Sequence, residues 1–246
     1  MSAALAGVRV LVTRPAHQAE NLCRLIEAEG GTAVRLPLMT IEPGTQLAEA
    51  RKRLAAAHDL WIFTSANAVR HAQPVATGAW PARLAAIGPA TAGAIAAAGH
   101  AGAATPLSGS SSEALLALPE FQALSGVRIL LVTGEGGRDL LERELGARGA
   151  SVERAEVYRR VPLPYPPEAI ASALRKTDVI VITSGESLEQ LLRATPEGSR
   201  ATLLKKQLVV PGARVVEKAR ELGFVQPPRV AEPMSDAALC SACAPP

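Results

Sequence analysis

The chain contains two phrases of the same pattern, and this repeat limits the folds that are open to it. DLWIFTS ends at Ser65 and DVIVITS ends at Ser184; each is an acidic residue, an apolar run and a Thr-Ser pair. The likeness extends further, because GVRVLVT from Gly7 returns as GVRILLVT from Gly126 with one additional apolar residue. The period of about 120 residues is the size of a domain. We therefore infer a duplicated domain and exclude a solenoid.

Within each copy, short apolar runs alternate with segments of helical periodicity. Runs that are apolar throughout are typical of parallel strands covered by helices on both faces. AENLCRLIEAEGG and RDLLERELGARG place leucines at helical spacing and close on glycine. The sequence therefore predicts two similar α/β domains, each a parallel doubly wound sheet flanked by helices. The predicted strands are Val8–Thr13, Leu60–Thr64, Leu84–Ile87 and Ala101–Ala104 in the first copy, and Arg128–Thr133, Val179–Thr183, Leu208–Val210 and Val225–Gln226 in the second.

Two Pro-punctuated segments interrupt this alternation at equivalent places in the two copies. They are RLPLMTIEPG, residues 35–44, and ERAEVYRRVPLPYPP, residues 153–167, and both are expected to be extended linker strands. The residues allow two divisions of the chain. Either two halves meet near residue 120, or both linkers cross between the domains.

Composition narrows the class of protein. Hydrophobic residues make up 48% of the chain but aromatic residues only 3%, so the cores must be aliphatic. The net charge of +3 suits an anionic small molecule but is too weak to indicate nucleic-acid binding. No apolar run approaches the roughly 20 residues that span a bilayer, and the first residues lack the charged region of a signal peptide. We expect a soluble, cytoplasmic protein.

Familiar nucleotide-binding, catalytic and metal-binding motifs are absent. GEGGRD has Asp139 where the third glycine of a dinucleotide fingerprint would stand, and neither a P-loop nor a nucleophile elbow occurs. The 4 histidines lack metal-ligand spacing, and His58 and His71 read as surface helix residues. Cys240 and Cys243 have no second pair for a tetrahedral zinc site and are expected to share one face of a final helix. The sequence predicts no metal.

Small hydroxyl residues and glycines follow the predicted strands. Parallel sheets bind ligands at the carboxyl ends of their strands, where helix N-termini present backbone N–H groups that favour carboxylate or phosphate. One interpretation makes Ser65, Ser184 and Thr91 ordinary caps or first-turn residues of their own helices. The other makes the turns an anion-binding site, which their number in two related domains favours. The turns are residues 13–15, 64–67, 88–91, 134–138, 183–187 and 211–214.

These features resemble the uroporphyrinogen-III synthase family, whose enzymes close a linear bilane into a ring. The resemblance covers nearly the whole chain and is carried by the order and spacing of VLVTRP, FTSANAV, AIGPATA, GGRDLLERELGARGASVERAEVYRR, ITSGESL and PGARV. It implies that the chain starts one domain, builds the other completely and returns, with a cleft between the two. The implied first domain is residues 1–36 with 163–246, the second is 42–155, and the linker strands are 37–41 and 156–162.

The resemblance also implies an activity. Uroporphyrinogen-III synthases are lyases of tetrapyrrole, and hence porphyrin and heme, biosynthesis that convert hydroxymethylbilane into uroporphyrinogen III, with loss of water and inversion of ring D. It implies no cofactor, no nucleic-acid or membrane partner, a monomer, and a substrate received from hydroxymethylbilane synthase. A non-catalytic two-domain protein that binds or senses an anionic small molecule would use the same cleft. A nucleotide-dependent enzyme is a third alternative, against which the missing glycine pattern counts.

Individual residues follow from the same resemblance. Tyr158 of VYRR matches a linker tyrosine placed to assist departure of the hydroxyl; its alternative role is a cross-strand aromatic contact. Arg214 stands where many relatives have threonine, so an arginine–carboxylate contact is expected to replace the threonine contact. The residues expected to bind substrate are Thr13, Arg14, Thr64, Ser65, Asn67, Thr91, Gly136, Arg138, Ser184 and Arg214.

Overall fold

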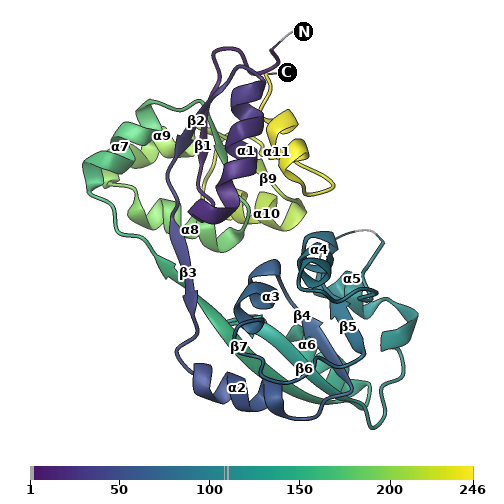
Figure 1. The fold of residues 1–246 in the computed structure, drawn as a ribbon. Coiled ribbons are helices and arrows are strands. Elements are labelled where there is room, and N and C mark those ends of the chain that lie inside the picture. Colours follow the sequence, from purple (N-terminus) through teal and green to yellow (C-terminus); the bar gives the residue numbers. More distant parts are fainter. Residues whose placement is uncertain (1–2, 108, 110, 246) are drawn as a thin grey trace. The chain divides into compact units, whose positions relative to one another are not determined.

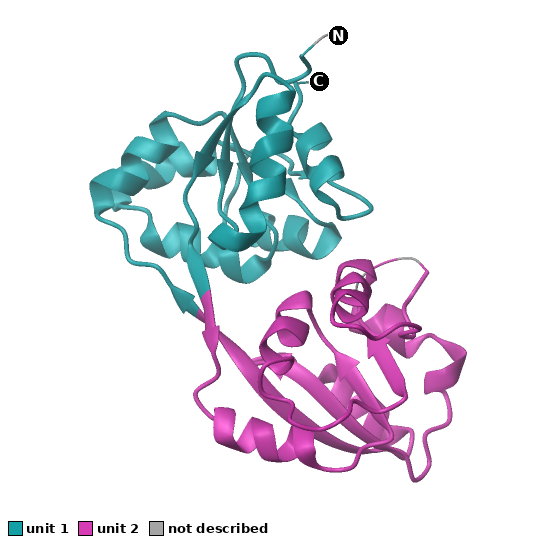
Figure 2. Cartoon of the chain, viewed as in Figure 1, with its two compact units in different colours: residues 1–40, 161–246 teal, residues 41–160 magenta. Residues whose placement is uncertain are grey.

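The computed structural model describes residues 3–107, 109 and 111–245, and the chain folds as two compact units. Unit 1 comprises residues 1–40 with 161–246, and unit 2 comprises residues 41–160 (Figures 1 and 2). Each unit is an α/β structure, as the sequence predicts. None of the helices in the described part of the chain has the length and apolar character required to cross a membrane.

Unit 1 is built on a sheet of five strands in the order β10-β9-β8-β1-β2, and every neighbouring pair runs parallel. Strand β1 joins segments that are distant in the sequence, since Val10 pairs with Val179 of β8. The strands are β1 (Arg9–Val12), β2 (Thr32–Arg35), β8 (Val179–Val181), β9 (Gln207–Val210) and β10 (Arg229–Val230); the helices are α1 (Ala16–Ala28), α7 (Pro167–Arg175), α8 (Gly185–Ala194), α9 (Glu197–Leu204), α10 (Ala213–Glu221) and α11 (Asp236–Ala242).

Alternation along the strands divides the core of unit 1 into two layers. Val10 and Val12 pack with α1 and α11, which Figure 1 shows side by side. Leu11 lies between them in sequence and packs on the opposite face, with α7, α8, α9 and α10. Burial of one such side chain contributes about 1.5–3 kcal/mol. The doubly wound arrangement predicted from the fully apolar strands is confirmed here.

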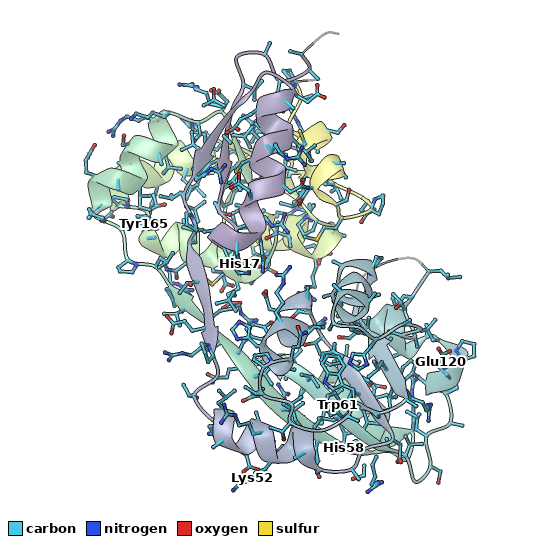
Figure 3. All side chains as sticks on the ribbon, in the orientation of Figure 1. His17, Lys52, His58, Trp61, Glu120 and Tyr165 are labelled. Atoms are coloured by element: carbon cyan, nitrogen blue, oxygen red, sulfur yellow. The ribbon has the colours of Figure 1, made fainter. Side chains whose placement is uncertain are left out.

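Unit 2 repeats this plan with the strand order β3-β7-β6-β4-β5. The pairs among β4, β5, β6 and β7 run parallel, and helices cover both faces. Trp61, labelled in Figure 3, packs against Phe63 and Trp80 on the face covered by α2, α3 and α4. The strands are β3 (Met39–Pro43), β4 (Leu60–Phe63), β5 (Arg83–Ala86), β6 (Arg128–Gly134) and β7 (Ser151–Pro162); the helices are α2 (Leu47–Ala55), α3 (Ala66–Ala72), α4 (Pro89–Ala97), α5 (Ser112–Leu116), the short 3-10 helix at Pro119–Phe121 and α6 (Leu140–Ala147).

The repeated acidic residues tie together the beginnings of two neighbouring inner strands in each sheet. Asp178 accepts hydrogen bonds from the Arg9 backbone N–H at 3.0 Å and from its guanidinium at 2.7 Å and 3.0 Å. Asp59 accepts from the Arg128 N–H at 2.8 Å in the same way. These bonds lower the pKa of both carboxyl groups. Each copy of the phrase thus supplies one acid to a strand whose first residue is arginine, Arg9 in β1 and Arg128 in β6.

The observed strands differ from the predicted ones at four places. Val225 is 70% exposed and belongs to no strand; the edge strand β10 forms after two prolines, at Arg229–Val230. The Ala101–Ala104 strand is reduced to a single bridge between Ala104 and Ala85. Strand β2 at Thr32–Arg35 was not predicted, and β7 begins at Ser151, before the predicted linker. β10 and β2 are edge strands and the bridge at Ala104 is short, so their sequences lack the fully apolar pattern of a central strand. β7 is an inner strand, but its first residues are exposed or only partly buried, so they lack that pattern as well.

Candidate active site

Tyr158 belongs to β7 and lies beside the last residue of β6, where the pairing of the two strands changes register. Thr133 pairs with Glu156 but Gly134 pairs with Tyr158, so β7 carries one additional residue at this point. As a result Val157 and Tyr158 are both buried although they are consecutive. A bulge of this kind redirects a side chain, and here it brings the phenol ring over the carboxyl end of the sheet.

Gly134 provides the space that the Tyr158 ring occupies. A Cβ atom added to Gly134 would lie 2.5 Å from Cζ of the ring and 2.7 Å and 2.9 Å from its two Cε atoms. Carbon atoms in contact are normally about 3.5–4.0 Å apart. Because Tyr158 is only 4% exposed, its ring has little freedom to move away. The glycine is therefore required by the close approach of the ring.

Two side chains donate hydrogen bonds to the Tyr158 phenol oxygen. The Ser65 hydroxyl donates at 3.1 Å and the Arg160 guanidinium at 3.3 Å. The same guanidinium lies 5.8 Å from the centre of the phenol ring, and the His71 ring centre is 5.8 Å from that of Tyr158. The phenol's own hydrogen has no acceptor among the residues the structure describes. Tyr158 is thus oriented by its neighbours and can donate a proton.

Ser65 and Ser184 are the N-caps of their helices, as one interpretation of the sequence predicted. Ser65 accepts from the Ala68 N–H at 3.0 Å and begins α3, and Ser184 accepts from the Ser187 N–H at 3.1 Å and begins α8. Each hydroxyl thereby accepts the hydrogen bond of one N–H group that would otherwise be available to a ligand at the helix N-terminus. Ser65 has a second role, because the same oxygen donates to Tyr158.

The other predicted residues of unit 2 differ in what they can still bind. Thr91 is 4% exposed in the first turn of α4, and its hydroxyl has no hydrogen bond within the described ranges. Thr64 donates to Thr133 Oγ1 at 3.0 Å, and the exposed Arg138 forms an ion pair with Glu113 at 3.0 Å. Two further residues complete the predicted set: Asn67, partly buried in α3, and Gly136, whose φ of 68° favours glycine.

In unit 1, two predicted residues already have partners within the protein and a third, Arg214, has none among the described residues. Thr13 is buried and donates to the Val181 carbonyl at 2.8 Å, which ties β1 to β8. Arg14 is paired with Asp236 and is largely buried, so its charge is already compensated. Arg214 is exposed in the first turn of α10 and forms no hydrogen bond or ion pair within the described part of the chain.

Some residues around Tyr158 were missed by the sequence reasoning. Arg160 lies within VYRR, Thr133 ends a predicted strand, and Gly134 begins the predicted turn at residues 134–138; none of the three is among the predicted site residues. The adjacency of a glycine and a buried tyrosine across two strands depends on the register of β6 and β7, which no short motif encodes. His58 was placed on a surface helix; it follows α2, and its side chain is only 3% exposed beside Glu153.

The cysteines belong to the core of unit 1. Cys23, Cys240 and Cys243 are buried in the layer between the sheet, α1 and α11. Burial raises the pKa of the Cys243 thiol to about 12, and its Sγ donates to the Leu239 carbonyl. No cluster of three His, Cys, Asp or Glu side chains suited to a metal ion occurs among residues 3–107, 109 and 111–245.

The fold and the turns define a class: two related α/β units with parallel sheets, carrying small hydroxyl residues and a buried tyrosine at strand ends. Residues 20–239 match the family model described as "Uroporphyrinogen-III synthase HemD". The chain is 39% identical over 225 residues to the uroporphyrinogen-III synthase of Salmonella typhimurium, covering 87% of this chain and 92% of that protein. Identity to the Escherichia coli K12 enzyme is 38% over 226 residues, with the same coverage.

Solved structures agree with this assignment. A mutant uroporphyrinogen III synthase from the extremely thermophilic bacterium Thermus thermophilus superposes with a TM-score of 0.65 at 25% identity, covering 95% of this chain and 96% of that one. The chain therefore belongs to the uroporphyrinogen-III synthase family, and the resemblance seen in the sequence motifs is confirmed.

Proposed function

We propose that this protein is a uroporphyrinogen-III synthase, a lyase that cyclises hydroxymethylbilane with inversion of ring D and loss of water. The observation that carries the proposal is the 38–39% identity that extends over 92% of two enzymes bearing this name. The proposal includes a cytoplasmic location, a monomeric state, delivery of the substrate by hydroxymethylbilane synthase, and linker roles for residues 37–41 and 156–162.

Tyr158 is proposed to donate the proton that lets the hydroxyl leave. The phenol O–H bond breaks as the proton passes to the substrate hydroxyl, and the carbon–oxygen bond breaks with its electron pair leaving on water. The substrate becomes an electrophilic azafulvene-type cation, and ring D attacks through its substituted carbon. Rearrangement through a spiro intermediate releases one proton, which restores the phenol. Proton donation of this kind accelerates a step by roughly a hundredfold or more.

The rest of the catalysis is proposed to be geometric. The bilane carries acetate and propionate groups, and without the enzyme it closes with ring D not inverted. Holding the reacting carbons in one arrangement is catalysis by proximity and orientation. Support comes from the Thr91 hydroxyl and the Arg214 charge, which have no partner among the described residues and can receive substrate groups. Thr64, Ser65, Asn67, Gly136 and Ser184 remain proposed contacts through side chain or backbone.

Thr13, Arg14 and Arg138 are weaker candidates within this proposal. Each already has an intramolecular partner: the Val181 carbonyl for Thr13, Asp236 for Arg14 and Glu113 for Arg138. A substrate carboxylate would have to displace Asp236 or Glu113. We retain all three as substrate-binding residues, with Arg14 and Arg138 contributing mainly to the local potential.

The test is product analysis with freshly generated hydroxymethylbilane. Chromatographic separation of the uroporphyrinogen isomers should show that the protein converts the bilane mainly into isomer III. A reaction without protein supplies the background of isomer I. Output of isomer I alone, at the rate of the background, would refute the proposal.

A further inference from the structure

We propose that Arg160 is a positioning residue that prepares Tyr158 to give up its proton. The inference rests on the proposed function, since it assigns a task within the same reaction. Arg160 is the last residue of unit 2 and follows Tyr158 by two positions on β7. No feature of the sequence distinguishes it from its neighbour Arg159.

A ring of hydrogen bonds holds Arg160 to Tyr158. The Glu135 N–H donates to the Tyr158 carbonyl at 2.8 Å, and the Glu135 carbonyl accepts from one arm of the Arg160 guanidinium at 3.1 Å. The other arm donates to the phenol oxygen at 3.3 Å. The guanidinium is planar and its donors have fixed directions, so fixing one arm sets the position of the other.

Glu135 is itself fixed. Its carboxylate accepts from the Thr45 backbone N–H at 2.5 Å and from the Thr45 hydroxyl at 2.7 Å, bonds that lower the pKa of Glu135. The turn that carries the Glu135 carbonyl is thereby attached to the loop between β3 and α2. The Glu135 carbonyl that accepts from Arg160 therefore belongs to a turn that is fixed at a second point.

The arrangement has two consequences for the phenol. A phenol oxygen that accepts from both Ser65 and Arg160 uses its lone pairs, which directs its own hydrogen away from these two groups. As that hydrogen leaves, negative charge develops on the oxygen, and a guanidinium already in place stabilises it without reorganisation. The effect should appear in the catalytic step and not in substrate affinity.

The experiment is a double-mutant cycle of Arg160→Gln with Tyr158→Phe, with Arg159→Gln as the matched control. Arg159 is the adjacent arginine of the same strand and pairs with Glu42 at 2.8 Å, away from the phenol. Arg160→Gln should lower kcat about ten- to a hundredfold with little change in KM, and Arg160→Lys should restore part of the loss. In the Tyr158→Phe background Arg160→Gln should cause no further loss. Arg159→Gln should be close to wild type.

Three results would overturn the proposal. They are a loss on Arg160→Gln of the same size in both backgrounds, a change confined to KM, and wild-type values of both kcat and KM in Arg160→Gln. The first two would mean that Arg160 contacts substrate directly.

A measurement without turnover separates this proposal from the proposed function. The chain has 2 tyrosines, so Tyr165→Phe leaves Tyr158 as the single source of the tyrosine Raman doublet, which reports whether a phenol accepts or donates. The doublet should indicate an accepting phenol and should change on Arg160→Gln; an unchanged doublet would refute the contact. If the wild-type protein forms no isomer III, the proposed function fails, while the doublet still decides whether Arg160 orients the phenol.

Discussion

Replacing Gly134 with alanine should slow the reaction strongly by displacing Tyr158 while leaving the fold intact. The new Cβ atom would lie 2.5 Å from Cζ of the ring, about 1 Å closer than carbon atoms normally approach. Gly134 has no positive φ, so the backbone tolerates alanine and the whole cost arises from this contact. A displacement of about 1 Å at a catalytic group costs on the order of a hundredfold in rate. The kcat for isomer III formation should fall to the level of Tyr158→Phe or below.

The cost in stability should be modest and traceable to the same contact. Overpacking a core costs about 1–3 kcal/mol, which lowers Tm by about 2–12 °C in a chain of this size. Truncating the ring by Tyr158→Ala removes the clash, so adding Gly134→Ala to that variant should change Tm little. Gly146→Ala is the matched control, because its Cβ would meet nothing within 4 Å inside α6 and should stabilise the helix slightly.

Circular dichroism, thermal unfolding and single-turnover kinetics on these variants test the reasoning. A Gly134→Ala protein with wild-type kcat would show that the ring position is unimportant to catalysis. A Tm loss that persists in the Tyr158→Ala background would place the strain elsewhere.

Three further outcomes are expected. Ser65→Ala and Ser184→Ala should each lose about 0.5–2 kcal/mol of unfolding free energy as lost caps, with activity lowered about tenfold or less; abolition of isomer III formation in a folded variant would contradict this. Arg214→Ala should raise KM and leave kcat nearly unchanged, as steady-state kinetics at varied salt would show; an unchanged KM would remove Arg214 from the binding set. Cys243 binds its proton more tightly when folded, so its contribution to stability is fully present below pH 9 and is lost as pH rises toward about 12. Urea unfolding between pH 8 and 11 should show this decline, which should be smaller in Cys243→Ala.

Much of the fold was predictable from the sequence because its central strands are buried on both faces. Short, fully apolar runs such as the one ending at Phe63 are typical of parallel strands covered on both faces. None of the described helices is long and apolar enough to cross a membrane, which would be the other common reason for such runs. The edges were not predictable on the same basis. Arg229–Val230 and Thr32–Arg35 are exposed or only partly buried, so their strand conformation depends on a neighbouring strand more than on their own composition.

The candidate site was predictable only in its chemistry. Thr-Ser pairs after apolar runs indicated caps at strand ends, and Ser65 is one; that it also donates to Tyr158 depends on a contact 93 residues away in sequence. The position of that tyrosine is decided by a bulge and by the absence of a side chain at Gly134. Both are properties of strand pairing, which a single sequence does not display.

The pairing of the repeated acids with the repeated arginines shows how the two copies combine into two sheets. Arg9 and Asp59 belong to the first copy, yet neither pairs with the other: Arg9 binds Asp178, and Arg128 binds Asp59. Each sheet therefore combines the opening strand–helix–strand of one copy with the later strands of the other copy. A chain divided near residue 120 would separate β1 from β8 and leave neither half with a complete sheet. The two copies have thus exchanged their opening strands. This exchange requires the backbone to pass between the units twice, at β3 and at β7.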